Sequence, residues 1–236
     1  MKRMRRKKLK LTIAAVIAFL VGFLSTIRSA PAQERFDLKV RNDFFAGFAG
    51  DKDALTRGMK ACETALAENP KNAQALVWHG GGLLFQAGTA FQGGDQQKGM
   101  ELWPRGLKEM QTAVDLEPDN VAVRIPRGAT LLASSRFTPP EFGKPLLVDG
   151  VADYQRTYDL QKAVFATLGS HPRGELLFGL AEGYSRLGDE ANATKYFEQI
   201  KRDLPDTAYA KRADLWMQNK SLPVAQTGCI GCHAGK

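Results

Sequence analysis

The residues best suited to chemistry lie in the last eight positions of the chain. Cys229, Cys232 and His233 form the pattern C-x-x-C-H within the closing stretch TGCIGCHAGK. Two thiols and an imidazole this close together can bind a metal ion, form a redox-active disulfide or hold a prosthetic group through sulfur. The rest of the chain contains one cysteine and two histidines, so no other stretch offers a comparable set.

The C-x-x-C-H spacing is the attachment signature of c-type haem. In that chemistry the two thiols add to the haem vinyl groups and the histidine becomes an axial ligand of the iron. The stretch CIGCHAG resembles the haem site of c-type cytochromes, and the resemblance covers about ten residues, 227–236. It implies one covalent haem c, attached through Cys229 and Cys232, with His233 as an axial ligand.

Two other interpretations of the motif are weaker. A structural zinc site needs four ligands, and only three are clustered here. A C-x-x-C redox pair usually opens a helix in a thioredoxin-like unit, and the sequence has no βαβ pattern. An oxidised pair without further function stays open as an alternative.

Only three residues follow the motif, so the second axial ligand comes from the body of the chain or from another chain, or it is absent. The candidates are His171, His79, Met217 and Met100. Each also has a structural interpretation, as a turn or core residue, and spacing alone favours none of them. The preceding stretch, residues 221–228, spans roughly 25 Å when extended. The motif can therefore reach the body of its own chain or a neighbouring molecule.

The N-terminus predicts export. A basic stretch, MKRMRRKKLK, precedes an apolar run at residues 11–24, and an A-x-A-like cleavage site follows at residues 30–32. This order is typical of a secretory signal peptide, here residues 1–32, and places the mature protein in the periplasm or otherwise outside the cytoplasm. The alternative is an uncleaved anchor: residues 11–27 are at the short edge for a membrane span and would hold the protein at the inner membrane.

The charge of the chain excludes a nucleic-acid footprint. Eight of the 33 Lys and Arg residues lie before residue 33, where no acid is found, so the remainder carries 25 basic and 25 acidic residues. The net charge of +8 therefore belongs to the leader, and we expect no nucleic-acid partner. Cys62 stands alone among small apolar residues, which is typical of an inert cysteine in a helix core.

The body contains an internal repeat. Pro70 and Pro118 lie 48 residues apart and share their surroundings: Ala65 matches Ala113, Gly58 matches Gly106, Asn72 matches Asn120, and Gly80 matches Gly128. A third copy, residues 174–205, has two apolar-periodic stretches separated by a Gly turn and ended by a Pro. Apolar spacings of 3 and 4 indicate amphipathic helices.

The third copy resembles a tetratricopeptide repeat (TPR), in which small residues let two antiparallel helices approach. The resemblance implies an all-α, TPR-like solenoid of antiparallel helix pairs over residues 33–219. Its four units are residues 39–72, 73–120, 121–173 and 174–207, and a capping helix follows at residues 207–217. Residues 220–236 then form a flexible C-terminal tail that carries the motif.

Units two and three exceed the 34-residue frame, and we place their extra residues near 87–103 and 134–150, at the turn inside each unit. These insertions contain four aromatic residues: Phe91, Trp103, Phe137 and Phe142. They are either surface loops or a binding edge. The first helices of units two and three would line the concave face with Val77, Trp78, Gly81, Leu84, Phe85, Ile125, Ala129 and Leu132. That apolar face is either a groove for a flat ligand or ordinary packing.

We therefore expect an exported TPR-like protein with one haem c that acts in electron transfer or in recognition of a redox-partner protein, rather than as an enzyme. Two alternatives remain. The protein is a scaffold for partner subunits in which the haem is marginal or structural, or it is a haem-based enzyme or sensor. Association with the membrane through residues 11–27 and self-association through the tail are further expectations.

Overall fold

The computed structural model describes residues 35–221. The chain divides into two compact units, Met1–Arg35 and Phe36–Lys236, and the fold below is that of the second unit. The predicted signal peptide, the segment 11–27 and the haem motif of Cys229, Cys232 and His233 lie outside the described residues. None of the helices within the described range is long and apolar enough to cross a lipid bilayer.

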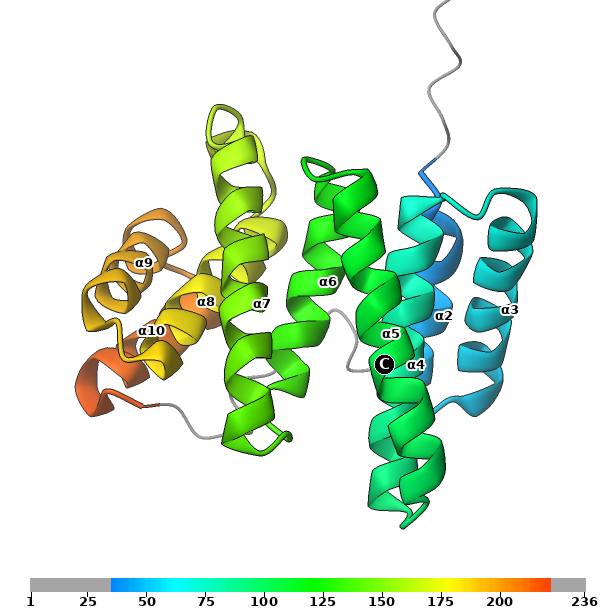
Figure 1. The fold of residues 1–236 in the computed structure, drawn as a ribbon. Coiled ribbons are helices and arrows are strands. Elements are labelled where there is room, and N and C mark those ends of the chain that lie inside the picture. Colours follow the sequence, from blue (N-terminus) through cyan, green and yellow to red (C-terminus); the bar gives the residue numbers. More distant parts are fainter. Residues whose placement is uncertain (1–34, 222–236) are drawn as a thin grey trace, which may run out of the picture. The chain divides into compact units, whose positions relative to one another are not determined.

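The described residues form an all-α fold of antiparallel helix pairs (Figure 1). Helices adjacent in sequence pack against each other, so α2 pairs with α3, α4 with α5, α6 with α7 and α8 with α9, and α10 packs on α9 and α8. The predicted fold class, four pairs and a final single helix, is confirmed. The helices are α2 (Asp37–Phe48), α3 (Lys52–Glu68), α4 (Ala73–Gln92), α5 (Gln96–Leu116), α6 (Val121–Ser134), α7 (Pro140–Gln161), the short 3₁₀ helix η1 (Phe165–Thr167), α8 (Ser170–Leu187), α9 (Glu190–Asp203) and α10 (Ala208–Asn219).

The repeated asparagines start the first helix of units two and three. The Asn72 side chain accepts a hydrogen bond from the backbone N–H of Ala75 (3.1 Å), and Asn120 accepts one from Ala122 (2.8 Å). Such caps satisfy backbone donors that have no partner inside the helix. The repeat in the sequence is therefore a repeat of helix starts.

Glycines allow the closest helix contacts. A Cβ on Gly80 would lie 2.7 Å from the carbonyl oxygen of Gly106, so the backbones of α4 and α5 touch at this point. Gly82 faces the other way, where Phe44 and Met59 fill the space that a side chain would need. Close packing therefore explains both Gly80 and Gly82.

The hydrophobic core consists of two clusters. One joins buried residues from α2 to α7, with Phe44, Trp78 and Met110 among them, and the other joins residues from α6 to α10, including Tyr196, Phe197 and Trp216. Trp216 stacks on Phe197 with ring centroids 4.5 Å apart. The last helix thus covers the end of the final pair, as a terminal cap must.

The extra residues of units two and three form helix more than loop. Residues 87–103 extend α4 and begin α5, and residues 134–150 end α6, cross a short connection and form the first half of α7. Pro104 consequently lies inside α5. The 34-residue frame placed loops here because it assumed helices of constant length.

The start of the fourth unit also differs from the prediction. Helix α8 begins at Ser170, so His171 lies in its first turn and not in a preceding loop. Pro172 is tolerated there because the first backbone N–H groups of a helix have no intrahelical partner.

Candidate functional site

The first helices of the four pairs face a shared cavity of about 1300 Å³. On α4 the lining residues Trp78, Gly81, Phe85 and Gly88 recur at spacings of three and four, so one stripe of this helix faces the cavity. Helices α2, α6 and α8 contribute in the same way. The volume exceeds that of most small-molecule sites, which hold about 300–1,000 Å³.

The predicted concave face is largely the cavity wall. Six of the residues expected there line it: Trp78, Gly81, Leu84, Phe85, Ala129 and Leu132. Val77 instead belongs to the core, and Ile125 is exposed but does not line the cavity. A Cβ added at Gly81 would lie 3.3 Å from Oγ1 of Thr130, which is a tight contact, so Gly81 lets α4 approach α6 closely.

The extended parts of units two and three form the side walls. All four aromatic residues of the predicted insertions, Phe91, Trp103, Phe137 and Phe142, line the cavity. In Figure 1 the α4–α5 and α6–α7 connections lie at the same, lower edge of the view. The two extra stretches therefore lie at one edge of the repeat stack, as the binding-edge alternative expects.

The wall is unusually rich in exposed apolar side chains. The exposed fractions are 70% for Met100, 76% for Phe137 and 65% for Phe142. Exposed apolar groups that gather around a hollow mark a binding site more often than chance surface exposure does. Chemically, the arrangement can surround a large apolar ligand.

One corner of the cavity is charged. Glu182 is buried, accepts a hydrogen bond from the Arg136 guanidinium (2.8 Å) and lies 3.7 Å from Nε of Arg186. Burial raises the pKa of Glu182, and the two guanidinium groups oppose that shift. Of these three residues, Arg136 and Glu182 line the cavity and Arg186 does not. Glu175, the other acidic lining residue, lies two turns earlier on α8 and accepts a hydrogen bond from the Tyr209 hydroxyl (2.5 Å).

The indole of Trp78 is a polar group that the fold leaves without a partner. Its Nε1 is buried and has no hydrogen-bond acceptor among residues 35–221. Trp78 borders the cavity and packs against Phe44 and Phe45 of α2, with ring centroids 5.2 and 5.7 Å away. An unpaired buried donor beside an apolar cavity is consistent with a ligand site.

The structure separates the four candidates for a second axial ligand. Met100 lines the cavity. His79 is buried between α4 and α5, where its Nδ1 lies 2.5 Å from Oε2 of Glu109. His171 Nδ1 lies 2.9 Å from the Tyr209 hydroxyl, and Met217 packs against the core of α8–α10. Only Met100 among the four therefore faces the cavity within the described residues.

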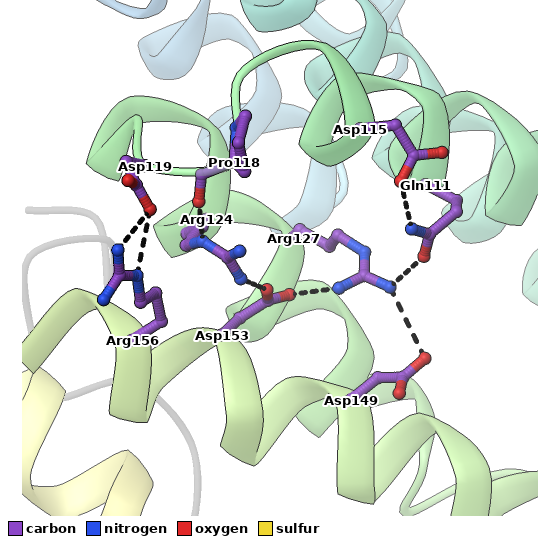
Figure 2. Close-up of polar contacts among 9 residues, drawn as sticks. All are labelled: Gln111, Asp115, Pro118, Asp119, Arg124, Arg127, Asp149, Asp153 and Arg156. Atoms are coloured by element: carbon purple, nitrogen blue, oxygen red, sulfur yellow. Dashed lines mark hydrogen bonds and ion pairs between the residues drawn. The ribbon is translucent and has the colours of Figure 1, made fainter.

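A buried ionic network, absent from the sequence predictions, holds α6 in place (Figure 2). Asp153 of α7 accepts hydrogen bonds from Arg124 and Arg127 of α6, both at 2.6 Å, and Arg127 also donates to Gln111 of α5 (2.7 Å). Burial raises the pKa of Asp153, against the effect of both arginines. A sequence signal for this network did exist. Arg124 and Arg127 lie three residues apart and Asp149 and Asp153 lie four residues apart, so each pair shares one face of its helix.

The described residues contain no group of three His, Cys, Asp or Glu side chains placed to hold a metal ion. Their contribution to a cofactor site is therefore the apolar cavity, the corner of Arg136 and the sulfur of Met100.

Comparison with known proteins gives one similarity of fold. No protein-family model and no curated protein matches the sequence. The crystal structure of a thermophilic TPR protein from Thermus thermophilus is 19% identical, covers 78% of this chain and 99% of its own, and superimposes with a TM-score of 0.35. The helix pairs described above establish the fold independently of this similarity.

Proposed function

We propose that this protein is an exported electron-transfer protein that carries one haem c on its C-terminal tail and recognises its redox partner through the helical body. The observation that carries the proposal is the C-x-x-C-H motif at residues 229–233, combined with a signal-like leader at residues 1–32. The apolar cavity supports it, because it supplies surroundings in which a haem would be shielded from water.

Each residue of the motif would have a separate part. The thiols of Cys229 and Cys232 each add across a vinyl double bond, the sulfur to one carbon and the hydrogen to the other, so the attachment consumes no oxidant. The imidazole of His233 would bind the iron. When attached, the haem would supply reversible one-electron chemistry between two partner redox proteins.

The wall of the cavity favours electron transfer over catalysis. Only three of the described lining residues are charged, Arg136, Glu175 and Glu182, and the latter two already hold hydrogen bonds to neighbouring side chains. An apolar wall excludes water and tunes the reduction potential, whereas turnover requires acid–base groups beside the substrate.

The test is covalent haem in the exported protein. The full chain is produced with cytochrome c maturation machinery, and the purified protein is examined by pyridine haemochrome spectroscopy and by mass. One haem per chain is expected, and a double variant, Cys229→Ser/Cys232→Ser, should carry none. A wild-type chain that stays free of covalent haem under these conditions contradicts the proposal.

A scaffold function is the second candidate, and the exposed Phe137 and Phe142 favour it because an amphipathic partner helix could pack on them. Removing residues 228–236 distinguishes the two functions. Partner binding that is unchanged in the truncated protein supports a scaffold, and binding that depends on the oxidation state of the haem supports electron transfer.

A further inference from the structure

We infer that the cavity is the docking site for the haem on the C-terminal tail of the same chain, and that Met100 supplies the second axial ligand. This inference rests on the proposed function and adds to it where the haem is held and by which residue. Three independent observations carry it: the chemistry of the cavity, the position at which the tail begins, and the donor that the wall presents.

The chemistry of the cavity matches a haem. The ring is flat and apolar, and the wall formed by α2, α4 and α5 offers aromatic surfaces, from Phe48 and Phe85 with centroids 4.9 Å apart and from Phe91 and Trp103 at 6.4 Å. The propionates of a haem are acidic, and Arg136, which also donates to Glu182, is the one basic residue among the described lining residues that could donate to them. Charge-assisted hydrogen bonds to arginine are the strong way to hold carboxylates.

The tail begins close to the cavity. Trp216 near the end of α10 donates from Nε1 to the Ser185 hydroxyl (2.8 Å). The residue after Ser185, Arg186, donates to the hydroxyl of Ser135 (2.8 Å). Both sequence neighbours of Ser135, Ser134 and Arg136, line the cavity. A few side-chain lengths therefore connect the last helix to the cavity wall.

The eight residues from 222 to 229 span at most about 29 Å when extended, which sets how far from the end of α10 the motif can reach. A short tether also makes docking intramolecular, with an effective concentration in the millimolar range. The chain's own haem therefore outcompetes the haem of a second copy at ordinary protein concentrations.

The donor is Met100. Among the described lining residues it is the one methionine, and no histidine or cysteine lines the cavity with it. Its stripe on α5 also includes Gln96, Trp103 and Pro104, all of which line the wall at helical spacing. Its 70% exposure leaves the side chain open to a ligand from outside the described residues. A thioether is a soft ligand suited to haem iron opposite a histidine, and this pairing raises the reduction potential.

The test uses the full-length, haem-loaded protein and a Met100→Ala variant. In the wild type we expect a low-spin spectrum with the sulfur-to-iron charge-transfer band in the red, and in the variant the loss of that band and a lower midpoint potential. Met217→Leu is the matched control, because Met217 packs in the core, and it should keep the band. A Met100→Ala protein with an unchanged spectrum and potential overturns the inference.

A second variant tests the cavity separately from the ligand. Nothing lies within 4 Å of a Cβ placed on Gly88, which lines the cavity, so Gly88→Trp should fold and place an indole in the space that the haem ring would need. We expect a native circular dichroism spectrum, covalent haem and loss of the sulfur band. A band that survives in this variant places the haem elsewhere and overturns the inference.

Two further outcomes separate the possible failures. If the band fades on dilution and light scattering shows dimers, the occupant is the tail of a second copy and the intramolecular site is wrong. If the haemochrome assay finds no covalent haem, the proposed function and this inference both fail. A positive haemochrome result with an insensitive Met100→Ala variant rejects the inference alone.

Discussion

Cys62 shows how burial can remove the reactivity of a cysteine. Its side chain is fully buried in α3, and burial, together with the charges of Glu109 and Glu63, raises the pKa of its thiol to about 12. Because the thiolate is the reactive form, very little of it exists at neutral pH. Cys62 therefore has a structural role, in contrast to the two cysteines of the terminal motif.

The first prediction follows from this burial. In a Cys229→Ser/Cys232→Ser variant, which leaves Cys62 as the single thiol, native protein should be labelled much more slowly than denatured protein by a thiol reagent at pH 8. The expected difference in rate is at least about tenfold, because only the thiolate reacts. Ellman's reagent with and without denaturant measures this. Rapid labelling of the native variant would show that α3 opens readily.

The ion pairs of Asp153 and Asp119 differ in burial and provide a second prediction. Breaking a buried pair leaves an uncompensated charge and costs about 3–5 kcal/mol, whereas an exposed pair contributes about 1 kcal/mol or less. Asp153 pairs with Arg124 and Arg127 in a buried site, and Asp119 pairs with Arg156 at the surface. The substitutions Asp153→Asn and Asp119→Asn break these pairs one at a time. Urea unfolding should show a loss of at least about 3 kcal/mol for Asp153→Asn. Equal losses would mean that solvent reaches the network.

At the scale of the helix, two glycines of α4 meet opposite surroundings. An alanine at Gly80 would place its Cβ 2.7 Å from a backbone oxygen of α5, whereas an alanine at Gly88 would meet nothing within 4 Å. Overpacking costs about 1–3 kcal/mol, and replacing an unconstrained helix glycine gains up to about 1 kcal/mol. We expect Gly80→Ala to lower and Gly88→Ala to raise the midpoint of thermal unfolding, as measured by circular dichroism. Shifts of the same sign would contradict the close contact of α4 with α5.

Much of the helix arrangement was predictable from local signals, but the helix lengths were not. The paired Asn72 and Asn120 revealed where helices start, because an asparagine cap acts on its own next turn. The turn at Gly94, with φ of 84°, followed by the Asp95 cap, marks the true α4–α5 connection. Because the prediction assumed a repeat of 34 residues, it did not use this turn to place the end of α4.

The candidate site was predictable only in part for a related reason. The aromatic residues of the extra stretches were identifiable because large apolar side chains in a supposed loop need cover. Met100 could not be separated from His79 or Met217, because the side of α5 that faces the cavity depends on where that helix begins and how it packs on α4. That information comes from tertiary contacts and not from spacing.

On the scale of the whole described body, the cavity lies between the two halves of the core. Its walls come from α2, α4 and α5, whose buried residues belong to one cluster, and from α8, whose residues belong to the other, with α6 contributing to both. A ligand that fills the cavity contacts both clusters at once. Docking therefore couples the stability of the first helix pairs to that of the last.

The final prediction measures this coupling through thermal unfolding. A haem that is docked about 99% of the time stabilises the native state by about 2.7 kcal/mol, because it binds the folded cavity and not the unfolded chain. For a body of this size that corresponds to a rise of about 5–10 °C in Tm. The haem-loaded wild type should therefore unfold at a higher temperature than the haem-free Cys229→Ser/Cys232→Ser protein, and in one transition.

The haem-loaded Gly88→Trp protein is the control for attachment without docking. It carries the same covalent group, but the tryptophan occupies part of the space in which the ring would lie, so it should gain less of the increase that loading gives the wild type. Its own haem-free form provides the reference, which removes the direct effect of the substitution. If loading raises Tm equally in both backgrounds, the stabilisation comes from the haem outside the cavity, and the two halves of the core are not coupled through it.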